Sequence, residues 1–161
     1  MRFSLPQFSL FQAVIAAAAL AAVFIGQYGF GLHPCHLCLY QRWPFAAIIV
    51  LGIFGYVMPR YARAAVACST LAFLIDCAIG VYHSGVERKY WAGLEGCSSP
   101  DMSGSIEELM ARIQSAAVTR CDEIEWSLMG ISLANMNVVL CAGMFALSVY
   151  VLLKSRSQAQ A

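Results

Sequence analysis

Four long stretches of mostly apolar residues dominate this sequence. They run from about residue 10 to 30, 40 to 58, 61 to 83 and 128 to 153. A helix needs about 20 mostly apolar residues to cross the hydrocarbon core of a membrane, so each stretch is long enough to span it. Turn or charge signals such as Pro59 and Lys154 bound the stretches, which favours separate helices joined by hairpins. We therefore expect an all-α membrane protein, a bundle of four transmembrane helices in a single domain over residues 1–161.

The composition agrees with a membrane location and excludes other classes. Apolar residues make up 60% of the chain and charged residues only 12%, whereas an ordinary soluble domain has about 25% charged residues. A formal net charge of +1 gives no basic surface for nucleic acid. Disordered chains are poor in apolar residues. We therefore exclude a water-soluble enzyme, a nucleic-acid-binding protein and a disordered chain.

The first stretch has an alternative interpretation as a secretory signal peptide. Arg2 provides a short basic start, and the alanine-rich run 16–22 provides an apolar core near a small-residue site. The apolar stretch is, however, longer than the roughly 7–15 residues of a signal core. We therefore expect it to be the first membrane span.

The basic residues indicate how the spans are oriented. The N-terminus, the turn after the second span and the C-terminus carry basic residues and no acidic ones. These basic residues are Arg2, Arg60, Arg63, Lys154 and Arg156. By the positive-inside rule, the three segments lie on the cytoplasmic side. The outer side then holds residues 31–39 and the long segment 84–127, which contains four basic and eight acidic residues.

The long outer segment contains a signal for a short helix. Ser105 and Glu108 fit a capping box, and apolar residues follow at helical spacing from Ile106 to Ala117. We expect an amphipathic helix here. Its apolar face could lie on the membrane surface or pack on the outer ends of the spans.

The seven cysteines divide into two groups. The four on the outer side, where an oxidising compartment permits disulfides, are Cys35, Cys38, Cys97 and Cys121. The three inside predicted spans, which we expect to be small buried apolar residues, are Cys68, Cys77 and Cys141. Four cysteines allow three pairings. Cys35 and Cys38 are close enough in sequence to pair with each other, which would leave Cys97 to pair with Cys121.

Cys35 and Cys38 form a CxxC motif where the second span begins. A cysteine near a helix N-terminus faces unpaired N–H groups and the positive end of the helix dipole. Both favour the thiolate, and we expect Cys38 to be that cysteine. Arg42 lies one helical turn further on and would add a permanent positive charge beside Cys38. The Arg42 guanidinium could also hold a carbonyl oxygen of a ligand, or simply reach toward water at the membrane boundary.

A CxxC motif also occurs in zinc sites, structural disulfides and haem attachment sites. Haem attachment requires a histidine directly after the second cysteine, where this chain has Leu39. A zinc site could recruit His33 and His36 together with the two cysteines, although adjacent turns rarely supply four ligands from six residues. The CxxC motif at the mouth of a span, the nearby arginine and the second outer cysteine pair together favour redox chemistry.

These features resemble the DsbB/DsbI family of membrane disulfide-generating quinone reductases, which is known to keep the bacterial periplasm oxidising. The resemblance covers nearly the whole chain. It is carried by PCHLCLYQR at residues 34–42, YHSGVE at residues 82–87, and CDEIEW at residues 121–126 followed by Gly130.

The resemblance implies an electron path through the four outer cysteines. Cys97 and Cys121 would form a disulfide that a soluble DsbA-type thiol oxidase of the thioredoxin fold attacks, with Cys97 in the mixed disulfide. Electrons would then pass to the pair of Cys35 and Cys38 and on to a membrane quinone, either ubiquinone or menaquinone.

The resemblance also implies a cofactor site and a location. Cys38 would react with the bound quinone, and Arg42 would help to hold it. His83 would lie near the quinone, although a histidine at the end of a span could also be an ordinary interfacial residue. The expected location is the bacterial inner membrane, with both termini in the cytoplasm and the redox cysteines in the periplasm.

Asp76 departs from the family's pattern. An acidic residue in the middle of a span is costly and is a functional candidate, here in handling protons as the quinone is reduced. It could equally form a hydrogen bond to Asn135 or Asn137 of the fourth span.

Two other functions stay open from the sequence, and a third is disfavoured by the early position of Cys35 and Cys38. A metal-binding membrane protein would use Cys35, Cys38 and nearby histidines to hold zinc or copper. A structural subunit would use the outer disulfides only to staple its loops. The vitamin K epoxide reductase type also combines four helices with a CxxC motif, but there the motif lies late in the chain.

Overall fold

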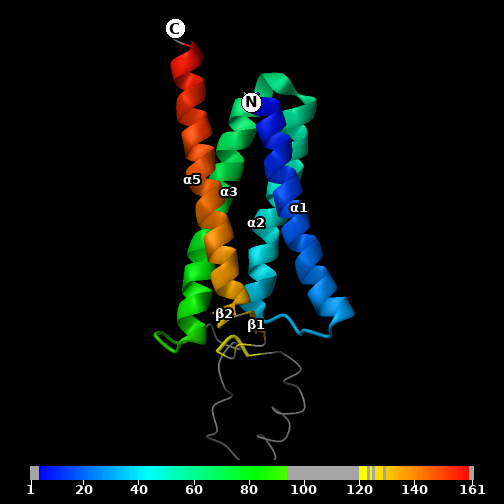
Figure 1. Cartoon of the computed structure of the whole chain (residues 1–161), viewed down its shortest axis with the longest axis vertical. Helices are drawn as coiled ribbons and strands as arrows, with labels where there is room; N and C mark the ends of the chain where they lie inside the picture. Colours follow the sequence, from blue (N-terminus) through cyan, green and yellow to red (C-terminus); the bar gives the residue numbers. More distant parts are fainter. Residues whose placement is uncertain (1–3, 94–119, 123, 125, 129, 160–161) are drawn as a thin grey trace, which may run out of the picture.

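The computed structural model describes residues 4–93, 120–122, 124, 126–128 and 130–159. Within these residues, four helices are long and apolar enough to cross a membrane. They pack side by side as a bundle (Figure 1). The prediction of an all-α, four-helix membrane bundle is confirmed. Cys97 and the amphipathic helix expected within residues 105–117 lie outside the described residues.

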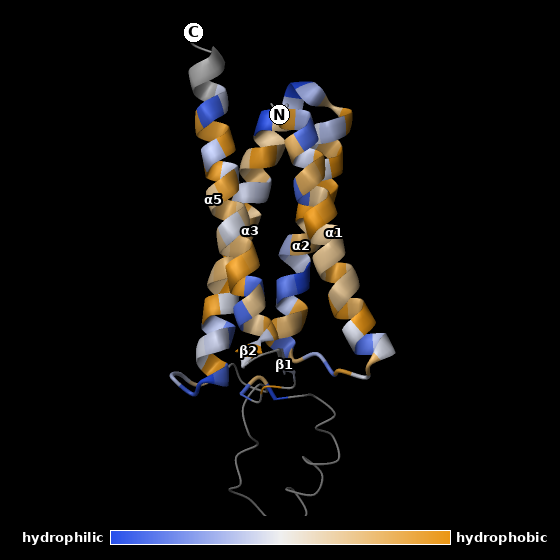
Figure 2. Cartoon of the chain, in the orientation of Figure 1, coloured by the Kyte–Doolittle hydropathy of each residue, from blue (hydrophilic) through white to orange (hydrophobic). Residues whose placement is uncertain are grey.

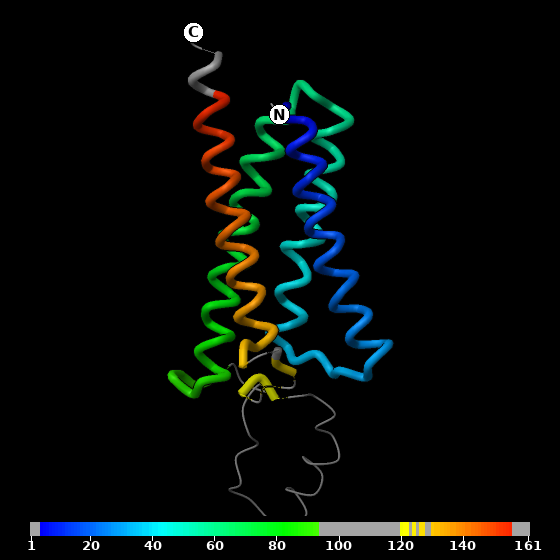
Figure 3. Tube along the Cα trace, viewed as in Figure 1, coloured from blue at the N-terminus to red at the C-terminus, as the bar shows by residue number. Residues whose placement is uncertain are grey.

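The elements alternate in direction along the bundle. The helices are α1 (Leu5–Gly29), α2 (His36–Val57), α3 (Ala62–Glu87) and α5 (Leu133–Ala159), with the 3-10 turn η1 (Pro59–Tyr61) before α3. A short antiparallel hairpin of β1 (Ser127–Leu128) and β2 (Ile131–Ser132) precedes α5. The trace in Figure 3 shows the start of α1, the turn between α2 and α3 and the end of α5 at one end of the bundle. The α1–α2 connection and the hairpin lie at the other end.

The helix boundaries differ from the predicted ones at three places that shape the site. α2 begins at His36 instead of residue 40, because the Cys35 side chain accepts a hydrogen bond from a backbone N–H of the first turn. α3 continues to Glu87, one turn beyond His83. α5 begins at Leu133 instead of residue 128, because the hairpin occupies the preceding residues and turns at Gly130 with φ of 81°.

The centre of the bundle is apolar and tightly packed. All four helices contribute to the buried cluster of Ala16, Phe45, Ile48, Phe73, Cys141 and Met144. Small residues bring α1 and α2 close together: a Cβ atom on Gly52 would lie only 2.6 Å from the Cβ of Ala13. Figure 2 shows that apolar residues cover most of each helix. Many of them, such as Val50 and Ile25, are exposed on the bundle surface, as contact with lipid requires.

The three cysteines within the spans do not share one environment. Cys141 is fully buried, Cys77 is half-buried and Cys68 is exposed on α3. The prediction of three buried cysteines is therefore wrong for Cys68, because its position on α3 faces away from the other helices. Asp76 is fully buried between α3 and α5. Its Oδ2 accepts hydrogen bonds from Asn137 Nδ2 and Cys141 Sγ, each at 2.9 Å.

Candidate active site

Cys35 and Cys38 lie together at the start of α2. Both are thiols, and their Sγ atoms are 2.9 Å apart. The backbone N–H of Cys38 donates a hydrogen bond to Cys35 Sγ at 3.3 Å, so Cys35 is the N-cap residue of the helix. The CxxC spacing therefore places both sulfurs on the first turn of α2, as the sequence predicts for this motif.

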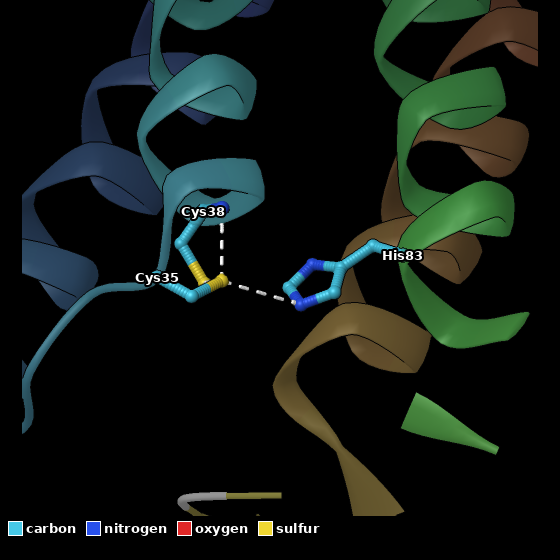
Figure 4. A group of neighbouring side chains, drawn as sticks. All are labelled: Cys35, Cys38 and His83. Atoms are coloured by element: carbon cyan, nitrogen blue, oxygen red, sulfur yellow. Dashed lines mark hydrogen bonds between the residues drawn. The ribbon is translucent and has the colours of Figure 1, made fainter. Parts of the chain in front are cut away.

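His83 reaches the pair from the last turns of α3 (Figure 4). Its Nε2 lies 3.5 Å from Cys35 Sγ, and its Nδ1 lies 3.3 Å from Gln41 Oε1. We assign the ring proton to Nδ1, because the amide oxygen of Gln41 can only accept a hydrogen bond. The lone pair of Nε2 then faces Cys35. The His83 ring is buried, so little water competes for this contact.

The protons of the two thiols are not equivalent. The hydrogen bond with Cys38, together with burial, raises the pKa of the Cys35 thiol to about 12, against a smaller lowering effect of the hydrogen bond with His83. Cys35 therefore keeps its proton at neutral pH and donates it to Cys38 Sγ. This arrangement favours Cys38 as the sulfur that carries negative charge and acts as the nucleophile.

Glu87 and Gln41 belong to the site but were not among the predicted site residues. Glu87 Oε1 lies 3.9 Å from His83 Nε2, and its side chain is only 6% exposed. The other oxygen of Glu87 accepts a hydrogen bond from Ser132 Oγ, which ties α3 to the hairpin. His83 and Glu87 are four residues apart, which places both on one face if the helix continues past residue 83. This spacing is the sequence signal that could have identified Glu87.

The chain returns to the site at Cys121. This residue is fully buried in a cluster with Cys35, Leu37 and Val86, and Cys38 packs against the same cluster. The structure therefore brings together three of the four predicted catalytic cysteines, whereas Cys97 lies outside the described residues.

The residues on both sides of Cys121 form an ion pair. Arg120 donates hydrogen bonds from Nε and Nη2 to the Asp122 carboxylate at 3.1 and 2.9 Å. These hydrogen bonds lower the pKa of the Asp122 carboxyl group. The pair restricts the short segment that presents Cys121 to the first two thiols.

Arg42 lies one turn beyond Cys38, but its observed contacts are with α1. Its Nη2 donates a hydrogen bond to Gln27 Oε1 at 2.8 Å, and its guanidinium carbon lies 4.9 Å from the centroid of the Phe24 ring. Within the described part of the chain, Arg42 Nε is buried without a hydrogen-bond partner. The structure therefore directs the arginine toward α1 and leaves one donor available to a ligand.

An apolar groove runs beside the thiols between α2 and α3. Its lining includes Leu37, Tyr40, Trp43, Ile75, Ile79 and Tyr82. Neither thiol, His83 nor Arg42 lines the groove, but Leu37 and Tyr82 also pack in the cluster that contains Cys35 and Cys121. The groove therefore continues from this cluster into the span. Its chemistry suits an apolar ring or hydrocarbon chain.

Known proteins are similar in sequence to this chain over most of its length. The family model for disulfide bond formation protein DsbB matches residues 6–151. Disulfide bond formation protein B 2 of Pseudomonas savastanoi pv. phaseolicola is 30% identical over 159 residues, which cover 89% of this chain and 86% of the relative. Disulfide bond formation protein B of Xanthomonas oryzae pv. oryzae is 28% identical over 137 residues, which cover 80% and 78% of the two chains.

A further relative is the uncharacterized protein RP370 of Rickettsia prowazekii, which is 27% identical over 129 residues. The matched residues cover 78% of this chain and 75% of the relative. The family match includes most of each of the four helices, together with Cys35, Cys38, His83 and Cys121. This chain therefore belongs to the DsbB family of disulfide bond formation proteins.

Proposed function

We propose that this protein reoxidises a soluble DsbA-type thiol oxidase and passes the electrons through two cysteine pairs to a membrane quinone. The observation that carries the proposal is that Cys121 and Cys35 belong to one buried cluster, against which Cys38 also packs. Thiol–disulfide exchange requires a thiolate to reach a disulfide sulfur directly. Cysteines of the two pairs that share one cluster can exchange electrons without a large movement of the bundle.

The first exchange oxidises the soluble partner. A thiolate of the reduced partner attacks Cys97 in a disulfide between Cys97 and Cys121, which forms a mixed disulfide and releases Cys121 as a thiolate. The second thiol of the partner then attacks the mixed disulfide. The partner leaves with a disulfide, and Cys97 and Cys121 hold the two electrons as thiols.

The second exchange moves the electrons to the membrane end of α2. Cys121 attacks the disulfide between Cys35 and Cys38, and Cys97 resolves the resulting bond by attacking Cys121. The disulfide between Cys97 and Cys121 is restored, and Cys35 and Cys38 become thiols. The position of Cys121 in the same cluster as this pair supports the direction of attack.

The last step returns Cys35 and Cys38 to a disulfide. A bound quinone would supply the acceptor for two electrons and two protons. Cys38 is the nucleophile, because Cys35 donates its proton to Cys38 Sγ in the reduced pair. His83 Nε2, 3.5 Å from Cys35 Sγ, is placed to accept the Cys35 proton as the bond between the sulfurs forms.

The residues at this end of the bundle fit a quinone in two respects. Arg42 Nε is a buried donor without a partner among the described residues, and a quinone carbonyl oxygen is an acceptor that it could serve. The groove from Leu37 to Tyr82 offers an apolar surface that shares these two residues with the cluster against which Cys38 packs. Arg42 would orient the ring, and apolar helix surfaces would take up the hydrocarbon tail.

The proposed location is the bacterial inner membrane with the thiols on the periplasmic side. The basic residues near both termini favour a cytoplasmic position for that end of the bundle. The described ends of the chain lie at one end of the bundle, opposite the start of α2, where Cys35 is the N-cap residue, which supports this orientation (Figure 1). The periplasm is also the compartment in which disulfides persist.

A purified system tests the proposal. The oxidised protein in detergent is mixed with a reduced DsbA-type partner and with ubiquinone or menaquinone, and quinone loss is followed by its ultraviolet absorbance. We expect fast reduction that Cys38→Ser and Cys97→Ser each abolish. Cys68→Ser is the matched control, because Cys68 is an exposed thiol on α3 outside the site, and it should keep the wild-type rate. If the partner causes loss of neither ubiquinone nor menaquinone, the proposal is contradicted.

A further inference from the structure

We propose that the reduced site binds one thiophilic divalent cation, Zn²⁺ in the first place, through Cys35, Cys38, His83 and Glu87. The ion and the disulfide exclude each other, so metal binding would hold the protein in a form that cannot generate disulfides. This inference depends on these side chains alone and on neither a quinone nor a soluble partner.

Three donors of the right chemistry already converge. The ligand atoms of Cys35, Cys38 and His83 all lie within 4.8 Å of one another. Thiolate sulfur and imidazole nitrogen are the donors that Zn²⁺ takes in proteins. His33 and His36, the histidines next to the CxxC motif, are exposed and do not join this group within the described part of the chain. The third ligand comes instead from α3.

The distances suit a tetrahedral ion. Bonds of about 2.3 Å to sulfur and 2.0–2.1 Å to nitrogen place the two atoms about 3.5 Å apart around such an ion. Cys35 Sγ and His83 Nε2 are 3.5 Å apart in the structure. Two sulfurs on one tetrahedral ion lie about 3.8 Å apart, and the two thiols here are 2.9 Å apart. Cys38, which is only half-buried, would therefore move its sulfur outward by about 1 Å on binding.

Glu87 lies outside this group of three, and its carboxylate would move toward the ion to supply the fourth ligand. Its Oε1 lies 3.9 Å from His83 Nε2, and an oxygen and a nitrogen on one tetrahedral ion are about 3.4 Å apart. Ser132 donates a hydrogen bond to the other carboxylate oxygen, which orients Glu87 toward the site. His83 and Glu87 are four residues apart on α3, so one helix face presents both ligands.

A second layer of contacts orients the histidine as metal sites require. Histidine ligands usually donate their other ring N–H to a carbonyl or carboxylate oxygen, which fixes the tautomer. Gln41 Oε1 lies 3.3 Å from His83 Nδ1 and provides this acceptor. Cys35 and His83 are each only 4% exposed, so bulk water would compete weakly for the ion.

The chemistry of binding explains the mutual exclusion. Zn²⁺ replaces the protons of Cys35 and Cys38, and the electron pairs of both thiolates enter bonds to the ion. No electron leaves either sulfur. A disulfide can form only after the ion has left, because oxidation would remove the pair of electrons that holds it.

Metal titration of the full-length protein in detergent tests the proposal. The protein is reduced, freed of reductant under argon and titrated with Zn²⁺, or with Co²⁺ as a spectroscopic probe of thiolate ligands. We expect one ion per chain in the reduced protein and none at these residues after oxidation. His83→Ala should weaken binding at least tenfold, whereas the control His36→Ala should not change it. Gln41→Leu should weaken binding about 10- to 100-fold as a positioning residue.

Two further variants keep the outcome clear. Cys97→Ser/Cys121→Ser should still bind one ion, since the other outer cysteines are not ligands in this proposal. Glu87→Gln, which keeps the shape of the side chain, should weaken binding without unfolding the protein, as circular dichroism would verify. Absence of thiolate bands with Co²⁺ in the reduced wild type, or equal losses in His36→Ala and His83→Ala, would overturn the metal site. The quinone assay on metal-free protein tests the proposed function independently of the metal site.

Discussion

Cys35 Sγ lies 3.5 Å from His83 Nε2, although the two residues are 48 positions apart in the chain. The contact exists because α2 begins and α3 ends at the same end of the bundle (Figure 3). The lone pair that faces Cys35 can accept a proton or bind a cation. One geometric relationship therefore connects the redox proposal with the metal proposal.

Replacement of His83 tests its role as proton acceptor. We expect His83→Ala to slow reoxidation of the Cys35 and Cys38 thiols by quinone about 100-fold, because His83 Nε2 is the side-chain base that is hydrogen-bonded to Cys35 Sγ. Rapid-mixing kinetics would measure the rate, with His36→Ala as the control. A change confined to the KM for quinone would assign His83 to quinone binding instead.

Arg42→Ala should weaken quinone binding. The variant loses Arg42 Nε, a buried donor of α2 that has no partner among the described residues. Since a hydrogen bond to a charged group contributes about 1.5–3 kcal/mol, the KM for quinone should rise about 10- to 100-fold. Arg60→Ala, at the opposite end of the bundle, is the control. Equal KM values for quinone in Arg42→Ala and Arg60→Ala would show that Arg42 does not bind the quinone.

Ser132→Ala should destabilise the hairpin and the start of α5. Ser132 Oγ donates to the Glu87 carboxylate and accepts a hydrogen bond from the backbone N–H of Asn135 at 3.3 Å. The loss of both contacts should lower the free energy of unfolding by about 1–3 kcal/mol. Thermal unfolding in detergent would measure the change against Ser127→Ala, which alters an exposed serine of β1. Similar Tm values would show that these contacts contribute little.

The Asp76 cluster allows a test between structure and proton handling. Asp76→Leu leaves Asn137 Nδ2 without its acceptor and should lower the free energy of unfolding by about 1–3 kcal/mol. Asp76→Asn keeps an oxygen acceptor and should cost less. If the residue is structural, the quinone reductase rate of Asp76→Asn will match that of the wild type. A stable Asp76→Asn protein with a large loss of rate would indicate proton handling.

Gly85 should tolerate no side chain. A Cβ atom there would lie 2.0 Å from Trp91 Cζ2, and Trp91 donates a hydrogen bond to the Tyr82 carbonyl at 2.8 Å. Gly85→Ala should therefore displace Trp91 and destabilise the protein by about 1–3 kcal/mol. Gly143→Ala is the matched control, because a Cβ atom there meets nothing within 4 Å. Thermal unfolding should show a lower Tm for the first variant alone.

Local features of the sequence were sufficient to predict the bundle. A span requires about 20 apolar residues, and a helix satisfies its backbone hydrogen bonds within its own segment, so each stretch can be judged alone. The same holds for the CxxC motif, whose spacing places Cys35 and Cys38 on one turn. The prediction that Asp76 bonds to Asn135 or Asn137 was confirmed for Asn137. The roles of Cys97 and of the helix expected at 105–117 stay predictions.

Tertiary packing determined the contacts that involve more than one helix. Apolar periodicity does not state which faces of two helices meet, and small shifts of a helix end change the partners of its last turn. The extension of α3 to Glu87 added a carboxylate to the site, and the packing of α1 turned Arg42 toward Gln27. Cys68 is exposed for the same reason, because the other helices pack against other faces of α3. The sequence determined how many helices cross the membrane and where the thiols lie along them, whereas contacts between helices determined what surrounds those thiols.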